Sequence, residues 1–485
     1  MIPHKQLSLA DIYDDCQKIF EDEKHEFLKL LERHINLSDY ISTSFWYRYN
    51  STIGRNRKYP LTALIWALLI QKILSIPTDR LLLTMLHLSK PLCEFCGFTK
   101  IPEASKITRF KQDFIVELQS VFDRLVDVTE PVCKKIDPQK AAETIFDTSG
   151  IEAYVTENNP KYANRIIKQL KHFKKTNNTD KSFDPYKAAY GSMPSHSKSN
   201  PAIKQMFING HFCYAYKFGI VTNGLGIIRD ISFFDRDYLM AHPDIAIDNK
   251  SGSPDEDKSL SDSKAVLPVL NDFFAKHPLI KPKTFIGDAA FDSMDIYYGL
   301  IRDLKFNEVY VPLNERRASG KAVCTANNNG VPCCPRDPSL PMKREGNMIH
   351  SKNGLTSLKF VCPKMCWKYD KQTKKSKRVC HCGDPCTSSA CGRMVYVYPE
   401  NNLRSFPGVV RGTDKWNDVY KHRSAVERGI NHLKDCFCVA DRKTQNDKTL
   451  HADLLLAGIT QLITVIVADA INKRQYIRSL KPLVA

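Results

Sequence analysis

The spacing of apolar residues changes near residue 144, and this change most constrains the fold. Before it, apolar residues recur every three or four positions, as at Ile107, Phe110 and Phe114, which predicts helices. After it, and up to residue 312, the pattern predicts a strand, a hairpin, a helix, a strand, a helix and a strand. The hairpin is expected at Thr222-Asn223-Gly224, because Asn-Gly tolerates positive φ. Strands that alternate with helices predict an α/β domain.

Composition shifts divide the 485 residues into three parts, which fits a prior of about 150 residues per domain. Residues 1–135 predict a helical N-terminal domain that binds DNA or serves dimerisation. Residues 140–314 and 413–475 predict the α/β domain, and the polar, cysteine-rich residues 315–412 are inserted into it. Within the α/β domain, residues 160–205 are rich in Lys, Asn, Ser and Pro, which predicts a mobile basic loop.

The charge balance favours a polyanionic partner. The chain has 71 Lys and Arg against 53 Asp and Glu, a formal charge of +18, which attracts nucleic acid; a merely solvated basic surface is the alternative. The apolar residues 61–76 and 454–471 contain polar or charged residues and are expected to be core helices, so no membrane partner is expected. The N-terminus lacks the apolar core of a signal peptide, so we expect a cytoplasmic, nucleoid-associated protein with reduced thiols.

Two aspartates follow strand-like apolar runs. Asp147 ends the run 144–147, and Asp288 follows the run 284–287. If the two strands are parallel neighbours, both carboxylates lie at the same sheet edge. Buried like charges are costly without a cation, and Mg²⁺ prefers carboxylate oxygens. The pattern therefore indicates a metal site, whereas an isolated aspartate at a strand end is more often a turn or cap residue.

A third acid lies in a helical pattern near the C-terminus. Tyr420, Arg423, Glu427 and Lys434 are separated by three, four and seven residues, so all four are expected on roughly one helical face. Glu427 would be a metal ligand, while Arg423 and Lys434 would lie beside DNA phosphates and Tyr420 could pack on a sugar or base. The alternative is an exposed helix with ordinary ion pairing.

These motifs together resemble the DDE transposases of bacterial insertion sequences. The resemblance lies in Asp147-Thr148-Ser149-Gly150, in Gly287-Asp288-Ala289-Ala290-Phe291-Asp292, and in Tyr420, Arg423, Glu427 and Lys434, whose spacing is similar to the family's Tyr-Arg-Glu-Lys signature. It implies a ribonuclease-H-like mixed sheet flanked by helices. Asp147, Asp288 and Glu427 would be catalytic and hold two Mg²⁺ or Mn²⁺ ions.

The resemblance also implies a reaction and partners. The protein would cut at the ends of an insertion sequence and join the freed 3′-hydroxyl to target DNA, as a homodimer that holds two ends. The chain departs from the family in its long, cysteine-rich stretch before Glu427 and in Phe291, where a tyrosine is commoner. A catalytically inactive or domesticated DNA-binding descendant, or a nuclease of the same fold that does not rejoin ends, would carry the same motifs.

The insertion 315–412 holds nine of the sixteen cysteines. Short cysteine spacings separated by a loop are usual for a structural zinc, and we expect four of five residues to bind one: Cys362, Cys366, Cys382, Cys386 and Cys391. Reduced cysteines without a metal are the alternative. Five basic residues between the cysteines could contact DNA or form a solvated loop: Lys371, Lys374, Lys375, Lys377 and Arg378.

Overall fold

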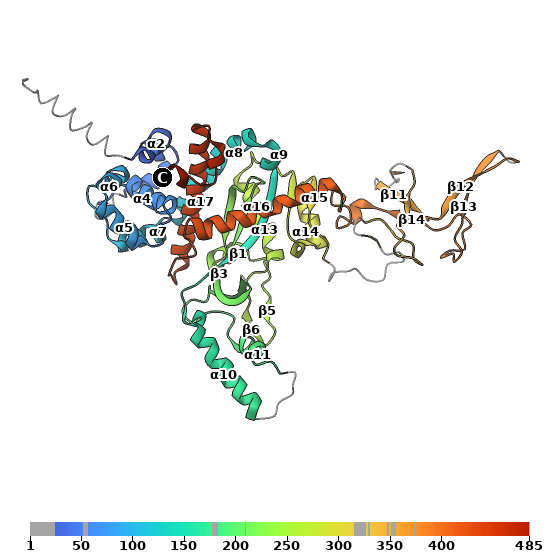
Figure 1. The fold of residues 1–485 in the computed structure, drawn as a ribbon, viewed down its shortest axis with the longest axis horizontal. Coiled ribbons are helices and arrows are strands. Elements are labelled where there is room, and N and C mark those ends of the chain that lie inside the picture. The colour runs from blue at the N-terminus through green and yellow to red at the C-terminus, as the bar shows by residue number, and fades with distance from the viewer. Residues whose placement is uncertain are drawn as a thin grey trace, which may run out of the picture.

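The protein consists of a mixed sheet surrounded by helices, with two extensions that leave the main body (Figure 1). A computed structural model describes residues 25–51, 57–176, 183–208, 210–314, 326–327, 330–346, 349–350, 356–372 and 374–484. Cys324 of the insertion lies outside these residues.

The helices expected before residue 135 are present: α2 (Glu26–His34), α3 (Thr43–Tyr49), α4 (Leu61–Ile73), α5 (Asp79–Leu88), α6 (Lys90–Cys96), α7 (Ala104–Asp113) and α8 (Ile115–Ile136), followed by the short α9 (Pro138–Ala141). Most of α4 is buried, because its sequence is apolar on all sides. Thr78 caps α5 by accepting a hydrogen bond from the Leu81 amide at 3.1 Å.

The α/β prediction is confirmed by a six-stranded mixed sheet in the order β2-β3-β1-β7-β8, with β4 beside β3. Its strands are β1 (Glu143–Glu152), β2 (Lys204–Ile208), β3 (His211–Thr222), β4 (Ile228–Phe233), β7 (Thr284–Ile286) and β8 (Glu308–Tyr310). β3 is antiparallel to β1, β2 and β4, whereas β1, β7 and β8 are parallel to one another. The sheet therefore changes from antiparallel to parallel at β1.

The expected hairpin joins β3 to β4, but its turn differs from the predicted Asn-Gly turn. The Asn223 carboxamide oxygen accepts hydrogen bonds from the amides of Leu225 and Ile227, both at 3.1 Å. The positive φ of +79° falls on Gly226. Asn223 thus organises a longer turn through its side chain, a role that asparagine commonly has in loops.

Helices of the C-terminal half pack around the sheet: α12 (Arg236–Ala241), α13 (Asp262–Lys276), α14 (Met294–Tyr298), α15 (Asp414–Tyr420), α16 (Ser424–Asn431) and α17 (Asp447–Ala470). α17 contacts α8, α4 and β4. By length and composition α17 could span a membrane, yet 89% of its most apolar window is buried inside the protein. It is the central core helix, as the sequence predicted.

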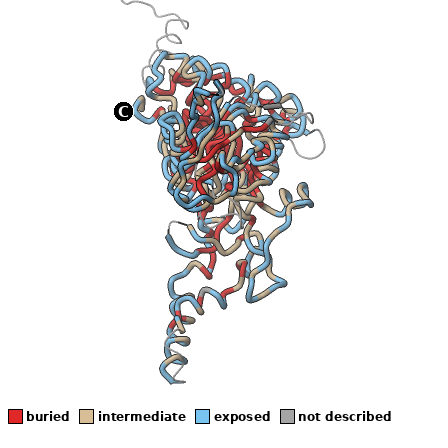
Figure 2. Tube along the Cα trace, turned by 90° about the vertical axis from the view of Figure 1, so that its right-hand side faces the viewer, coloured by how far each residue is buried: buried red, intermediate tan, exposed pale blue. Residues whose placement is uncertain are grey.

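The prediction of a mobile loop over residues 160–205 is wrong, because most of this segment is helical: α10 (Pro160–Thr176) and α11 (Pro185–Ser192). The Asn159 side chain accepts a hydrogen bond from the Lys161 amide at 3.0 Å, and Pro160 suits a first turn. The high lysine content led the prediction to miss an apolar stripe on α10. In this stripe Ile167 is buried, and Tyr162 and Ile166 pack against the core. The distal part of α10 is mostly exposed (Figure 2).

The inserted segment forms small sheets away from the body. Its strands are β9 (Lys343–Arg344), β10 (Ile349–His350), β11 (Thr356–Val361), β12 (Met365–Asp370), β13 (Lys375–Cys380) and β14 (Met394–Val397). β12 and β13 make a two-stranded hairpin at the far end of the molecule (Figure 1). Another two-stranded unit, β5 (Asn249–Lys250) with β6 (Ser253–Asp257), lies near α11.

A buried cluster of charges joins the N-terminal helices to α17. Asp453 of α17 is fully buried, and one of its oxygens lies 3.1 Å from Lys72, 3.0 Å from Lys111 and 3.2 Å from Arg442. Asp79 adds a second carboxylate, 2.8 Å from Lys111 and 2.9 Å from Arg442. Three cations thus face two carboxylates, and burial together with the neighbouring Arg442 lowers the pKa of Lys72 to about 7.

We expect Asp453→Asn to lower the free energy of unfolding by about 3–5 kcal/mol, because removing one partner of a buried ion pair leaves the other uncompensated. Lys72→Met is the matched control: it leaves two cations with two carboxylates and should cost much less. Urea denaturation of both variants measures the difference. Equal losses would show that charge balance in this cluster does not control stability.

Candidate active site

The parallel pairing of β1 with β7 brings the two predicted aspartates to one edge of the sheet. Ile145 pairs with Ile286, and Asp147 and Asp288 each lie two residues further along. Asp147 is still within β1, where it pairs with Ile220 of β3, and Asp288 lies two residues beyond the end of β7. The expected arrangement of two neighbouring parallel strands is therefore present.

Aromatic packing holds these two strand ends together. Gly287, before Asp288, has no room for a side chain, since a Cβ atom there would lie 2.7 Å from the Phe291 ring. Phe291 is buried, and its ring centroid lies 5.7 Å from that of Phe146, the residue before Asp147. In this chain the aromatic residue of the second motif therefore packs one acid-bearing strand end against the other.

The segment that carries Glu427 is helical but irregular. After α15 it tightens into a 3₁₀ turn over Lys421–Arg423, continues as α16, and widens into a π-helical turn over His432–Cys436. α16 covers the sheet face that carries Asp147: a Cβ on Gly429 would lie 3.2 Å from Thr222, which pairs with Ile145 on that face. Glu427 is thereby placed beside the two strand ends.

All three acids meet at one guanidinium group. Arg423 Nη2 lies 3.1 Å from Asp288 Oδ2 and 3.5 Å from Asp147 Oδ2, while Arg423 Nη1 donates to Glu427 Oε1 at 2.5 Å. The exposed fractions of the acidic side chains are 19% for Asp147, 49% for Asp288 and 51% for Glu427. The site is therefore open to solvent on one side, and its charges converge on a single cation.

The acids are not packed as tightly as the ligands of one metal ion would be. Their oxygens do not all lie within 4.8 Å of one another, because the wider guanidinium separates them. A metal ion at this place would require Arg423 to withdraw. Arg423 was expected beside DNA phosphates or in an ordinary ion pair with Glu427, so its contacts with Asp147 and Asp288 are a feature that the sequence did not indicate.

Burial perturbs the titration of the site. Burial raises the pKa of Asp147 to about 6, against the opposing effects of Arg423 and of the Thr148 amide, which donates to Asp147 Oδ1 at 2.8 Å. Burial also raises the pKa of Tyr420, and the three acids add to this shift. The Tyr420 ring stacks on Trp416 with ring centroids 4.6 Å apart. The effect of the three acids on its pKa shows that Tyr420 borders them.

Two further charged residues adjoin the site and were missed from the sequence. Thr148 Oγ1 donates to Asp262 Oδ1 at 2.5 Å, and Lys217 Nζ donates to the same oxygen at 2.6 Å. The negative charge of Asp262 contributes to the raised pKa of Asp147. Asp262 begins α13 and Lys217 lies within β3, so only the fold brings them to Asp147.

Lys434 lies apart from the acids, in the π-helical turn. Burial lowers its pKa, against the opposing effects of the nearby Asp435 and Cys213. Near it, Glu152, His211 and Cys213 form a group whose donor atoms all lie within 4.8 Å of one another. Burial raises the pKa of Cys213 to about 11, and the adjacent Lys434 repels cations, so this group is poorly suited to hold a metal ion.

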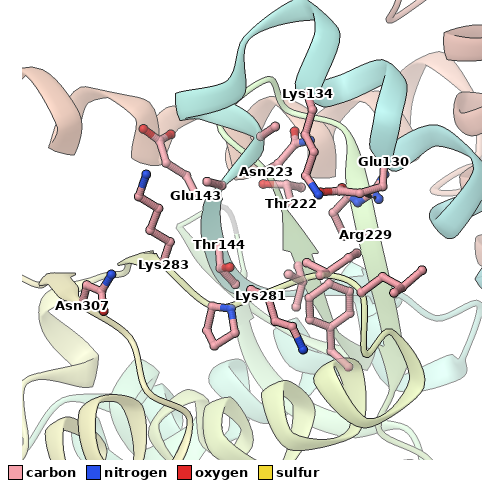
Figure 3. Close-up of a pocket in the computed structure, with 17 residues that line it drawn as sticks. Glu130, Lys134, Glu143, Thr144, Thr222, Asn223, Arg229, Lys281, Lys283 and Asn307 are labelled. Atoms are coloured by element: carbon pink, nitrogen blue, oxygen red, sulfur yellow. Dashed lines mark hydrogen bonds and ion pairs between the residues drawn. The ribbon is translucent and has the colours of Figure 1, made fainter.

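A cavity of about 330 Å³ lies at the opposite edge of the sheet (Figure 3). Its lining includes Glu143 and Thr144 at the start of β1, Lys283 just before β7 and Asn307 just before β8. These are the amino ends of the parallel strands, whereas Asp147 and Asp288 lie toward their carboxyl ends. The cavity is therefore separate from the acids.

The predicted zinc ligands do not all meet. Cys362, Cys382 and Cys386 line one cavity, together with Cys334 and Cys380, which were not predicted. Cys366 and Cys391 do not line it.

Comparison with known proteins matches one segment of the chain to a described family. Residues 15–113 match the family described as "Transposase domain (DUF772)". No curated protein sequence gives a significant match. Among solved structures, the cryo-EM structure of a piggyBac transposase synaptic complex with hairpin DNA aligns over 94% of this chain and 79% of that chain, with 10% identity and a TM-score of 0.35. This TM-score is too low to indicate a shared fold.

We expect Asp147→Asn to raise the unfolding temperature of metal-free protein at pH 8 and to raise it by about half as much at pH 5. The folded protein holds the Asp147 proton more tightly than the unfolded chain does, so the stabilisation by this proton is complete below about pH 4 and is lost as the pH rises through about 6. The loss is on the order of 3 kcal/mol.

Thermal unfolding with a chelator present measures this effect, with Asp295→Asn, an exposed acid on α14, as the control for removing one negative charge. A rise of equal size at both pH values would argue that the burial of Asp147 is not its cause.

Proposed function

We propose that this protein is a DNA transposase whose catalytic residues are Asp147, Asp288 and Glu427. The observation that carries the proposal is their convergence, from β1, the end of β7 and α16, on the Arg423 guanidinium. The spacing of the three acids in the sequence resembles that of DDE transposases, and the match of residues 15–113 to a transposase domain supports the same function independently.

The donor chemistry of the three acids fits a divalent cation. Three carboxylates around the single Arg423 guanidinium leave an excess of negative charge that a metal cation can balance. Hard carboxylate oxygens suit Mg²⁺ or Mn²⁺. Two such ions, when bound, would stabilise the attacking and leaving oxygens of a phosphoryl displacement. The mixed sheet, with two acids at adjacent strand ends and a third on a covering helix, is consistent with the ribonuclease-H-like fold that the resemblance implies.

The chain's basic residues would hold the DNA. With the acids neutralised by metal, Arg423 is released from them and can bind a phosphate near the scissile bond. Tyr420 borders the acids and presents an aromatic surface beside them. Further cations lie on the two extensions, on α10 (Lys161, Arg165, Lys168, Lys171, Lys174 and Lys175) and on the β12–β13 hairpin (Lys368, Lys371, Lys374, Lys375, Lys377 and Arg378).

The reaction that we propose has two steps. Water attacks the phosphodiester at the element end, and the bond to the 3′ oxygen breaks to leave a free 3′-hydroxyl. That hydroxyl then attacks a phosphodiester of target DNA, forms one new ester bond and releases one target 3′-hydroxyl. Each displacement occurs at a phosphate, so a single acidic site can serve both.

We expect Asp147→Ala, Asp288→Ala and Glu427→Ala each to reduce cleavage and strand transfer by at least a hundredfold and to leave binding of element ends largely intact. Asp418→Ala is the matched control, because Asp418 is an exposed acid on α15 that pairs with Lys421. A labelled element end incubated with plasmid and Mg²⁺ or Mn²⁺ reports both products. Normal cutting by any of the three variants would exclude that residue from catalysis, and cutting without joining would indicate a nuclease.

Arg423→Gln should tighten Mn²⁺ binding by roughly tenfold in the absence of DNA, because the guanidinium no longer competes for the acids and a charge-assisted hydrogen bond contributes about 1.5–3 kcal/mol. The same variant should bind element ends more weakly. Arg428→Gln is the control, since Arg428 lies on the same helix and donates to Ser424 at 2.6 Å. Isothermal titration calorimetry measures the metal affinity, and an unchanged or weakened Mn²⁺ affinity of Arg423→Gln would contradict the competition.

A further inference from the structure

Five cysteines of the insertion surround one cavity of about 290 Å³. Cys362 directly follows β11, Cys380 ends β13, and Cys382 and Cys386 lie in the loop after it. Cys334 comes from a separate segment and pairs with none of these strands. Three parts of the insertion that are distant in sequence, at residues 334, 362 and 380–386, therefore bring thiols to the same cavity.

The two best-placed thiols have the spacing of metal ligands. Cys362 Sγ and Cys380 Sγ lie 3.5 Å apart. Two sulfurs bound to one tetrahedral Zn²⁺ at about 2.3 Å each are about 3.8 Å apart, whereas a disulfide bond measures about 2.05 Å. Every cysteine in the described residues is a free thiol. Cys334 lines the same cavity as these two thiols.

Backbone contacts fix the positions of these thiols. The amides of Cys334, Cys362 and Cys380 donate to the carbonyls of Leu340, Arg393 and Ala390 at 2.9, 2.9 and 3.1 Å. Gly392 keeps the space beside them open: its φ is +74°, and a Cβ atom there would lie 2.9 Å from Cys362 Cβ and 3.1 Å from Cys380 Sγ. The cavity is therefore built by the chain rather than left between mobile loops.

Cys366 and Cys391 do not line this cavity. In the β12–β13 hairpin Met365 is opposite Cys380, so Cys366, one residue further, points to the other face, where it is opposite Val379. Cys366 is exposed, and Cys391 does not line the cavity. The insertion therefore contains cysteines that line the cavity and cysteines that do not.

The module has little else to stabilise it. Its described residues form two small apolar clusters, one of Met342, Leu358 and Phe360 and one of Val361, Cys362 and Met365. A core of this size is insufficient for a segment of this length, and small modules of this kind usually depend on a disulfide or a metal ion.

We propose that the insertion binds one structural Zn²⁺ through Cys334, Cys362 and Cys380, with Cys382 or Cys386 as the fourth ligand. Each thiol gives its proton to solvent when it binds the ion, because the thiolate is the ligand. The ion ties the base of the basic β12–β13 hairpin to the segment that carries Cys334. This proposal does not depend on the transposase reaction.

Elemental analysis of the purified full-length chain tests it, with about one equivalent of zinc expected. Cys334→Ser, Cys362→Ser and Cys380→Ser should each reduce the zinc content to less than half of the wild-type value, whereas Cys366→Ser and Cys391→Ser should retain it. One of Cys382→Ser and Cys386→Ser should behave like the first group and so identify the fourth ligand. Less than half an equivalent in the wild-type protein, or equal losses in all variants, would overturn the proposal.

A second measurement avoids variants that fail to fold. In the wild-type protein, Cys334, Cys362 and Cys380 should resist alkylation until a strong chelator is added, and Cys366 should react in both conditions; peptide mass spectrometry resolves the sites. Alkylation of all of them without chelator, or a Cys362–Cys380 disulfide in the non-reduced protein, would contradict the proposal.

Discussion

Asp453 is the buried charge on which the assembly of the protein depends. It lies in the middle of α17, and Lys72, Lys111 and Arg442 surround it without solvent. Burying charges in this way is favourable only when every partner is in place. The cluster therefore fixes how α4 and α7 sit on the helix that packs against the mixed sheet, and it fixes the N-terminal helices relative to the three acids.

Much of the acid site could be predicted because it follows from strand ends and helical spacing. Asp147 and Asp288 were recognisable because each ends a buried apolar run, and parallel pairing of the runs then places them together. The position of Arg423 could not be predicted, because a residue four positions before Glu427 could equally face solvent or DNA. Only the packing of α16 on the sheet turns its guanidinium toward all three carboxylates.

Other features depended on contacts that no local pattern contains. Composition concealed the apolar stripe of α10, since six cations on that helix outweigh a few apolar residues in any average over the segment. Cys334 lies 28 residues before Cys362 in the sequence and reaches it only through the fold of the insertion. Conversely, Cys366 has a suitable spacing from Cys362 but is opposite Val379 in the β12–β13 hairpin and does not line the cavity. Spacing predicts neighbours along one element and does not predict which elements meet.

The Arg423 guanidinium partly neutralises the acid site, because one positive charge faces three carboxylates. A protein that carries its own counterion at these carboxylates has a smaller electrostatic demand for a free ion, and the carboxylates repel a DNA backbone less than bare acids would. In a DNA-cutting enzyme, such an internal counterion would keep the acids paired until metal and phosphate together replace the contacts that it makes. Under the proposed function, hydrolysis is then coupled to the arrival of metal and DNA together.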